Sequence, residues 1–312
     1  MLAIGLDLGG HGVKSGIVRL GTLEVNHYED LRYNAAKSNR AIAKSDIPRA
    51  VRLQAVIESI QRLIRVEPTV GAIGLASTGI IDSAAGIVLD DQAPDYVGTD
   101  WLSELRQNFG NEFYFHVEND AKCAVWGEYV TWNNRPGERI EPPSSLVQLT
   151  IGSGIGAGVV LNGQILSGAN YVAGEFGSLP FRSCGSKDSV TIESISAAPG
   201  LLRNGKCDSL VRLNELYSVG NKSAVSAVAL GAEALGHGLA AIINILGPAA
   251  VIFSGGVVDL VPSYKSLIIE QAKPYCEPAA LKAVKFVEGS LGRFAGLVGA
   301  GNLALSARRS VG

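Results

Sequence analysis

The chain has 312 residues, of which 47% are hydrophobic and 18% are charged, and its formal net charge is −2. This length is large for one domain and suits two, and the composition provides a sizeable core and excludes a disordered chain. The near-balance of charge argues weakly against nucleic acid as the main partner, because nucleic-acid-binding proteins usually carry a basic footprint.

Cysteine usage and the N-terminus predict a cytoplasmic protein. No two of the four cysteines have CxxC spacing, which favours a reduced, cytosolic setting over a disulfide scaffold. The first residues contain neither a basic n-region nor an apolar h-region, so we expect no signal peptide. Apolar runs are interrupted well before the roughly 18 residues that a membrane span needs, so no membrane partner is expected.

The first part of the chain alternates strand and helix patterns. A buried strand at 2–8 is followed by a glycine turn and a second apolar run, which is typical of a β-hairpin. Apolar residues recur at helical spacing through 48–66. Trp101 begins a further helix and is open to two interpretations, cleft lining or core packing. The expected elements are strands 2–8, 13–20, 70–75 and 113–117 and helices 48–66, 101–109 and 119–132.

A polar stretch with three prolines, 133–145, predicts a loop before the second part. A glycine turn at 152–158 then separates two strands, and Asn162-Gly163 predicts a tight hairpin turn. The expected elements are strands 146–151, 157–161 and 249–253 and helices 223–246 and 295–307.

Residues 5–14 and 149–158 share one plan of strand, polar residue, glycine turn and strand. Two such hairpins in one chain indicate a duplicated domain with a cleft between the halves.

The glycine turns of these two hairpins are candidate phosphate sites. Glycine lets the backbone approach a ligand closely, and concave arrays of N–H groups bind anions. The second turn is followed by a strand, unlike a dinucleotide-binding turn, and the sequence has no P-loop motif. The alternative is that both are ordinary hairpin turns. The candidate contacts are Asp7 (to Mg²⁺, through water), Gly9, Gly10, His11, Lys14, Thr150, Gly152, Ser153 and Gly154.

In their order and spacing, seven motifs together resemble the ROK family of sugar kinases and repressors, which belongs to the actin-like superfamily of two-domain ATPases. The resemblance implies an α/β, two-domain actin-like (ribonuclease H-like) fold with a central cleft. It implies an N-terminal domain of residues 1–118, completed by the C-terminal helix 296–312, and a larger domain of residues 119–295. The motifs are residues 7–14, 74–82, 118–128, 150–156, 173–177, 252–257 and 295–300.

The resemblance also implies that ATP and Mg²⁺ are cofactors and that Asp120 is the catalytic base. Gly255 and Gly256 would face the adenosine. Other interpretations stay open. Asn119 and Asp120 could cap a helix, and Glu175, Glu193 and Lys14 could be surface charges. The implied sugar-binding residues are Gly79, Asn119, Asp120, Glu175 and Glu193.

The sequence departs from the family pattern in two places. Ser178 stands where a histidine is usual, and only Cys184 remains of three cysteines that hold a structural zinc in many members. One such ligand cannot hold zinc, so we expect no structural zinc site. His11 stands where Thr or Ser is usual.

These inferences predict an ATP-dependent sugar kinase acting on a hydroxyl, the 6-hydroxyl, of a hexose or N-acetylhexosamine. Segments 75–81 and 119–126 resemble N-acetylmannosamine kinases more than glucokinases, and 94–101 resembles a segment of zinc-free members of that group. The resemblance thus implies N-acetylmannosamine first, then glucose, then a β-glucoside. The alternatives are a non-catalytic sugar sensor and a transcriptional regulator. Family repressors carry a helix-turn-helix before the first phosphate motif, and only six residues precede Asp7. Family members are commonly dimers or tetramers, and a homodimer is expected.

Overall fold

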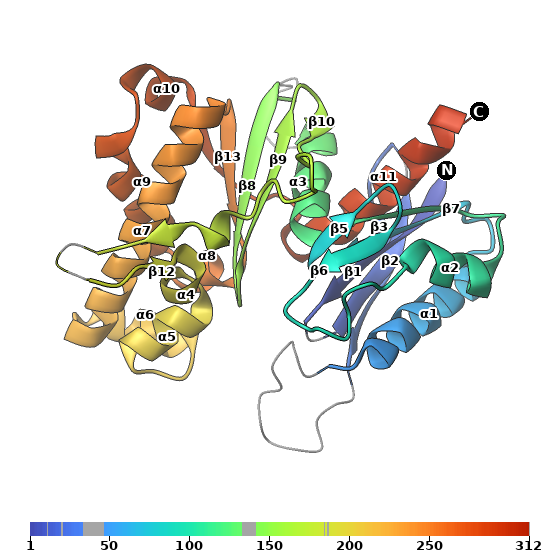
Figure 1. Cartoon of the computed structure of the whole chain (residues 1–312), viewed down its shortest axis with the longest axis horizontal. Helices are drawn as coiled ribbons and strands as arrows, with labels where there is room; N and C mark the ends of the chain where they lie inside the picture. The colour runs from blue at the N-terminus through green and yellow to red at the C-terminus, as the bar shows by residue number, and fades with distance from the viewer. Residues whose placement is uncertain are drawn as a thin grey trace. The chain divides into compact units, whose positions relative to one another are not determined.

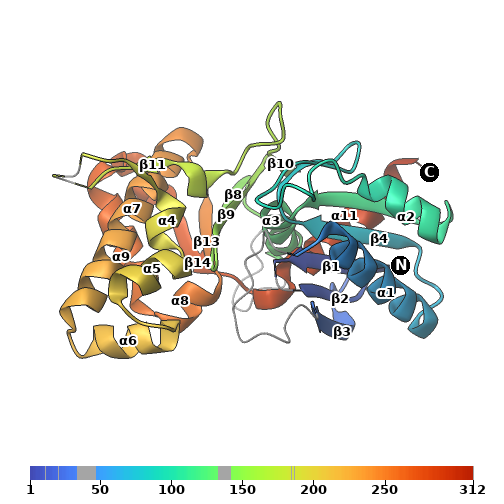
Figure 2. The ribbon, with the colours of Figure 1, turned by 60° about the horizontal axis from the view of Figure 1, so that its bottom comes forward.

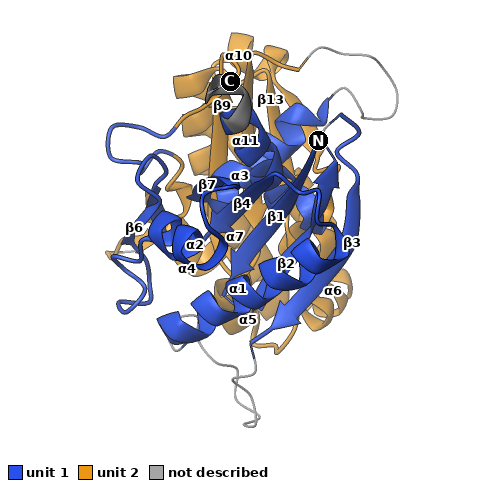
Figure 3. Cartoon of the chain, turned by 90° about the vertical axis from the view of Figure 1, so that its right-hand side faces the viewer, with its two compact units in different colours: residues 1–141, 167–173, 293–312 blue, residues 142–166, 174–292 orange. Residues whose placement is uncertain are grey.

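The computed structural model forms two compact units (Figure 3). Unit 1 comprises Met1–Glu141, Ser167–Ala173 and Arg293–Gly312, and unit 2 comprises Pro142–Leu166 and Gly174–Gly292. The structure describes residues 1–10, 12–19, 21–33, 47–132, 142–183, 185 and 187–311.

Unit 1 is built on a five-stranded mixed sheet with the order β3-β2-β1-β4-β7. The hairpin of β1 and β2 extends antiparallel to β3, whereas β4 and β7 run parallel to β1. The strands are β1 (Leu2–Gly9), β2 (Gly12–Arg19), β3 (Val25–Arg32), β4 (Ala72–Ser77) and β7 (Tyr114–Asn119).

Helices cover both faces of this sheet, because alternate residues of a strand point to opposite faces. Ile4 and Leu6 of β1 share a core with Val56 of α1 (Arg49–Val66). Ala3 instead packs against Leu305 of α11 (Ala295–Val311), the C-terminal helix. Figures 1 and 2 show α1 along the sheet. The short hairpin of β5 (Ile80–Asp82) and β6 (Ile87–Asp90) and the helix α2 (Trp101–Phe109) complete this part.

Small residues let α11 approach its neighbours at backbone distance. A Cβ atom at Gly74 of β4 would lie 1.9 Å from the carbonyl oxygen of Ala300, and one at Gly299 would lie 1.8 Å from that of Cys123. Cys123 belongs to α3 (Asp120–Val130), which packs along α11. Any side chain at either glycine would therefore separate α11 from the sheet or from α3.

Unit 2 repeats the same sheet topology with the order β10-β9-β8-β13-β14. Again a hairpin, β8–β9, continues into a third antiparallel strand, and two parallel strands follow on the other side. The matching orders support the duplication expected from the sequence. The strands are β8 (Ser145–Ile151), β9 (Ile155–Leu161), β10 (Gln164–Ile165), β13 (Ala250–Ser254) and β14 (Lys285–Glu288).

The helices of unit 2 gather on one face of its sheet (Figures 1 and 2). The longest is α7 (Lys222–Leu246), capped by Asn221 and ended by Gly247 in the left-handed conformation. By length and composition α7 could cross a membrane, but most of its apolar stretch is buried in unit 2, as expected of a core helix. The others are α4 (Ile192–Ser196), α5 (Ala198–Gly205), α6 (Leu210–Ser218), α8 (Gly256–Leu260), α9 (Ser263–Ala272) and α10 (Pro278–Ala283).

Most predicted elements occur within a few residues of their expected bounds, and Trp101 is a core residue, fully buried beside Tyr96. The sequence pattern missed β3, β14 and several short helices of unit 2. The predicted domain boundary at residue 118/119 assigns α3 to the second domain, whereas α3 makes its contacts with α11 in unit 1. The proposed division into folding domains stays a prediction.

We expect acid stability to depend on His116, which lies in β7 with Nε2 shielded and without a partner among the described residues. Burial lowers the pKa of His116 to about 4. As the pH falls from about 6.5, the unfolded chain therefore takes up the proton before the folded one. We expect the free energy of unfolding to be fully present above pH 6.5 and to fall by about 1–3 kcal/mol toward pH 4.

Urea unfolding of His116→Gln as a function of pH measures this contribution. The variant should lose less stability than the wild type between pH 6.5 and 4. His27→Gln, which replaces an exposed histidine of β3, is the matched control and should keep the wild-type pH dependence. Identical profiles for all three proteins would contradict the assignment.

Candidate active site

Three parallel strands of unit 1 end at one edge of the sheet. The register pairs Asp7 of β1 with Ala76 of β4, and Ala76 with Glu118 of β7. Neighbouring strands lie about 4.8 Å apart, so Asp7 and the segment after Glu118 are separated by roughly two strand spacings. Ligands of α/β proteins bind outside the carboxyl ends of such strands.

Asn119 joins two segments at this edge. Its Oδ1 caps α3 by accepting hydrogen bonds from the N–H groups of Ala121 (3.0 Å) and Lys122 (3.1 Å). Its Nδ2 donates to the carbonyl oxygen of Gly79 at 2.9 Å, just after β4. The capping role expected as an alternative for Asn119-Asp120 thus falls to Asn119.

Asp120 is the first residue of α3 and is partly exposed. Its Oδ1 accepts a hydrogen bond of 2.8 Å from the N–H of Ala121. The N-terminus of a helix favours negative charge. A carboxylate in this place has the chemistry of a proton acceptor for a bound hydroxyl.

Asp7 pairs with a lysine of the adjacent strand. Lys14 Nζ lies 3.1 Å from Asp7 Oδ2, and a Cβ atom at Gly296 of α11 would lie 3.1 Å from the Asp7 carboxyl carbon. Burial lowers the pKa of Lys14, but the Asp7 carboxylate outweighs this effect, and the net pKa is raised. The pair therefore places a stable cation and a carboxylate beside the first glycine turn, where Tyr33 donates a hydrogen bond to the Gly9 carbonyl oxygen.

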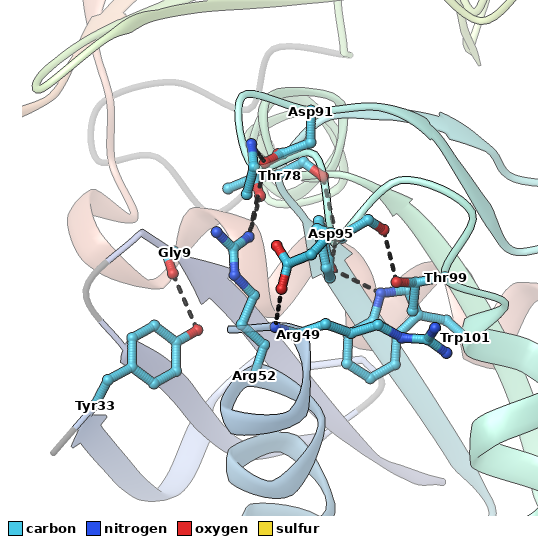
Figure 4. A network of polar contacts seen from close by, with 12 residues as sticks. Gly9, Tyr33, Arg49, Arg52, Thr78, Asp91, Asp95, Thr99 and Trp101 are labelled. Atoms are coloured by element: carbon cyan, nitrogen blue, oxygen red, sulfur yellow. Dashed lines mark hydrogen bonds and ion pairs between the residues drawn. The ribbon is translucent and has the colours of Figure 1, made fainter. Parts of the chain in front are cut away.

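A buried arginine supports the segment at the end of β4 (Figure 4). Arg52 of α1 is 1% exposed, and its Nη1 lies 3.5 Å from Thr78 Oγ1 and 3.8 Å from Asp91 Oδ1. Its guanidinium stacks 4.5 Å above the ring centre of Tyr96. Tyr96 in turn hydrogen-bonds Ser77 at 2.6 Å. Ser77 and Thr78, at the end of β4, are thus bound by a buried polar network that includes Arg52, Asp91 and Tyr96.

Unit 2 brings its own predicted phosphate residues together. Thr150 pairs with Ser254 across β8 and β13, and their hydroxyl oxygens are 3.1 Å apart. Gly255 follows with a φ of +99°, and a Cβ atom there would lie 2.5 Å from the carbonyl oxygen of Ile151, so this position requires glycine. The Gly152 carbonyl oxygen accepts from the N–H of Ala198, the first residue of α5. The second glycine turn and the Gly255 turn are therefore adjacent.

Glu193 is tied to the same turn. Its Oε2 accepts a hydrogen bond of 2.7 Å from the N–H of Ile155, and a Cβ atom at Gly177 would lie 3.2 Å from this oxygen. Gly177 belongs to the segment that begins with the exposed Glu175. The two glutamates predicted to bind sugar thus belong to neighbouring segments, and Glu193 also supports the second glycine turn.

A groove with a volume of about 670 Å³ lies between α5 and α6 in unit 2. Its rim carries Arg203, Lys206 and Arg212 against the single acid Asp208. The helix α6 packs against α8, which begins at Gly256, and α5 begins at the second glycine turn. The helices on both sides of the groove therefore contact predicted nucleotide-binding segments: α5 contacts the turn at Gly152, and α6 contacts the helix that begins at Gly256.

Several predictions were not tested. His11, Cys184 and Ser186 lie outside the described residues, and the zinc-free state stays a prediction. In the described part of the chain no group of three or more His, Cys, Asp or Glu residues could hold a metal ion. Sequence reasoning missed Arg52, whose only signal was a charge on the apolar face of a predicted helix. The roles of the predicted site residues stay predictions.

The Arg52 network is open to a direct stability test. Arg52→Met leaves Asp91 buried without this cation, and breaking a buried pair in this way costs about 3–5 kcal/mol. We expect that loss in the free energy of unfolding measured with urea. Arg49→Met is the matched control, because the ion pair of Arg49 with Glu104 is half-exposed and such pairs contribute about 0–1 kcal/mol. Equal losses for the two variants would contradict a supporting role for Arg52.

Comparisons with known proteins agree over nearly the whole chain. The N-acetyl-D-glucosamine kinase of Photobacterium profundum is 27% identical over 242 residues, covering 71% of this chain and 77% of that protein. The glucokinase of Thermotoga maritima is 27% identical over 256 residues, covering 74% and 78%. The crystal structure of the ROK hexokinase from Thermus thermophilus matches with a TM-score of 0.78 and 25% identity over 100% of both chains.

The structural match confirms the predicted two-domain actin-like α/β fold. The model of the ROK family matches residues 3–307. A match of this extent, together with the repeated sheet topology and the similar kinases, shows that the chain belongs to the ROK family.

Proposed function

We propose that this chain is an ATP-dependent sugar kinase that phosphorylates a hydroxyl, the 6-hydroxyl, of a hexose or an N-acetylhexosamine. The observation that carries the proposal is the arrangement at the end of β7, where Asn119 caps α3 and binds Gly79 while Asp120 begins the helix. The named activities of the similar proteins support the same class of reaction.

In this proposal Asp120 accepts the proton of the attacking sugar hydroxyl as the oxygen bonds to the γ-phosphorus of ATP and the bond to the bridging oxygen of ADP breaks. A positioned general base contributes about 10²–10⁴ to such rates. Asn119 and Gly79 would orient the same sugar from unit 1. Glu175 and Glu193 would accept hydrogen bonds from other hydroxyls. Positioning and charge neutralisation are the main contributions to phosphoryl transfer.

The glycine turns supply the nucleotide contacts in this proposal. The N–H groups near Gly9 and Gly152 would face phosphate oxygens, with Lys14 as a nearby cation. The groove between α5 and α6, with a volume of about 670 Å³, would hold the nucleoside end of ATP, and α6 packs against α8, which begins at Gly256. Mg²⁺ prefers oxygen ligands, keeps several waters and binds substrate phosphates, which fits the single carboxylate of Asp7 in this place. When bound, the ion neutralises phosphate charge.

The cellular setting and assembly complete the proposal. The reduced cysteines and the ATP requirement favour the cytoplasm, and we propose a homodimer. Equilibrium sedimentation of the purified chain measures its oligomeric state.

The substrate is expected among N-acetylmannosamine, glucose, N-acetylglucosamine and β-glucosides, with the first two favoured. ADP release from the wild type with each sugar and MgATP identifies it. The matched control is the 6-deoxy analogue of the best sugar, which should bind without being phosphorylated. Turnover of that analogue would contradict the 6-hydroxyl as acceptor, and binding of sugars without any turnover would favour a sugar sensor.

Asp120→Asn tests the base. The amide retains an oxygen for the Ala121 N–H but cannot take a proton, so kcat should fall by about 10²–10⁴ while the KM for ATP changes little. Asp100→Asn is the control, since Asp100 directly precedes α2 and its Oδ1 accepts a hydrogen bond from the Ser103 N–H. Unfolding curves would show that both variants are folded. Wild-type turnover by Asp120→Asn would exclude general-base catalysis by this residue.

A further inference from the structure

Lys122 is a buried lysine two residues after Asp120 on the same helix. Its side chain is 2% exposed, and its Nζ donates a hydrogen bond of 2.8 Å to the carbonyl oxygen of Tyr171. The same nitrogen lies 3.9 Å from Glu118 Oε1, whose side chain is also buried. Lysine is almost never fully buried unless it is paired, because removing its charge from water is costly. The charge therefore calls for an explanation beyond packing of α3.

The backbone that Lys122 holds belongs to an unusual piece of chain, the crossover segment, Ser167–Ala173. These residues are part of unit 1, although the residues on both sides of them belong to unit 2. Tyr171 has a φ of +61°, which is rare for a residue with a side chain. Its hydroxyl hydrogen-bonds Asp82 of β5. The main chain and the side chain of Tyr171 are thus both bound to unit 1.

The crossover segment joins two parts of the candidate site within unit 1. Lys122 binds Tyr171 from α3, the helix that begins with Asp120, and Asp82 binds it from β5, which follows Gly79.

We propose that Lys122 is a positioning residue for sugar binding: by binding the Tyr171 carbonyl oxygen, it keeps the start of α3, with Asn119 and Asp120, aligned with residues 79–82, which contact the same sugar. The inference rests on the proposed kinase function and deepens it. Lys122 acts through the crossover segment and touches neither sugar nor ATP. Its loss impairs sugar binding and leaves nucleotide binding intact.

Steady-state kinetics of Lys122→Met test the proposal. Removing a hydrogen bond from a charged donor should raise the KM for the sugar about tenfold or more, while the KM for ATP stays within about twofold. Lys122→Arg retains charge and donors and should recover part of the sugar affinity. Thr131→Val is the control for general damage to α3, because Thr131 is buried and bonds only within the helix through Gly127 and Glu128 in the described contacts. It should lower stability without changing either KM.

Hydrogen exchange provides a readout that needs no activity. In the protein without ligands, amides of residues 171–174 should exchange faster in Lys122→Met than in the wild type or Thr131→Val. Tyr171→Phe, which removes only the bond to Asp82, is a second variant expected to fold, and it should raise the sugar KM in the same direction.

The outcomes separate the two proposals. An active wild type with unchanged sugar KM in both Lys122→Met and Tyr171→Phe would overturn the role of Lys122, as would unchanged exchange at 171–174. A wild type that phosphorylates no sugar would overturn the kinase proposal, and the exchange data would still decide whether Lys122 holds the segment.

Discussion

The backbone-distance packing of α11 is the constraint on which unit 1 depends. The helix contacts β1, β4 and α3 at once, and this is possible only because glycines and alanines line the contacts. Gly296 leaves space for the Asp7 carboxylate, and Gly299 lets the backbone of Cys123 on α3 pack directly against α11. The last helix of the chain thus fixes both the strand that carries Asp7 and the helix that begins with Asp120. Since interiors pack as densely as organic crystals, one added methyl group here would displace groups of the candidate site.

In each unit the predicted site residues lie at the corresponding place of the same sheet topology. In unit 1 these residues follow β1, β4 and β7, and in unit 2 they follow β8 and β13. The contents differ. Unit 1 carries the carboxylates Asp7 and Asp120, whereas unit 2 carries a glycine turn braced by Glu193 and followed by α5. The two copies of the scaffold therefore differ in the side chains at this place, with carboxylates in one copy and a glycine turn in the other.

Sequence reasoning succeeded where a local signal was strong. The glycine turns, the helix that begins at Trp101 and the segment 118–120 each carry periodicity or a capping signature, and each occurs in the structure. It failed at β3, whose side chains alternate poorly because the strand lies at an exposed sheet edge. It also missed the hydrogen bonds of Arg52 and Lys122, because their acceptors Thr78 and Tyr171 lie 26 and 49 residues away in the chain. Tyr171 is 49 residues from Lys122, and no spacing rule connects them.

The two supporting cations show how the candidate site is kept in place. Arg52 donates a hydrogen bond to Thr78 in the segment that follows β4. Lys122 of α3 donates one to the Tyr171 carbonyl oxygen in the crossover segment. Both are buried charges, which cost free energy unless their geometry is maintained, and so both restrict the backbone that they bind to one arrangement. Such restriction suits a reaction whose rate depends on the alignment of two substrates.

The most direct test of the account is a crystal structure of the wild-type chain with its best sugar and a non-hydrolysable ATP analogue. We expect the acceptor hydroxyl within hydrogen-bond distance of an Asp120 carboxylate oxygen, the phosphates against the turns at Gly9 and Gly152, and Glu175 on the same sugar. A sugar bound away from Asp120, or phosphates that contact neither glycine turn, would contradict it.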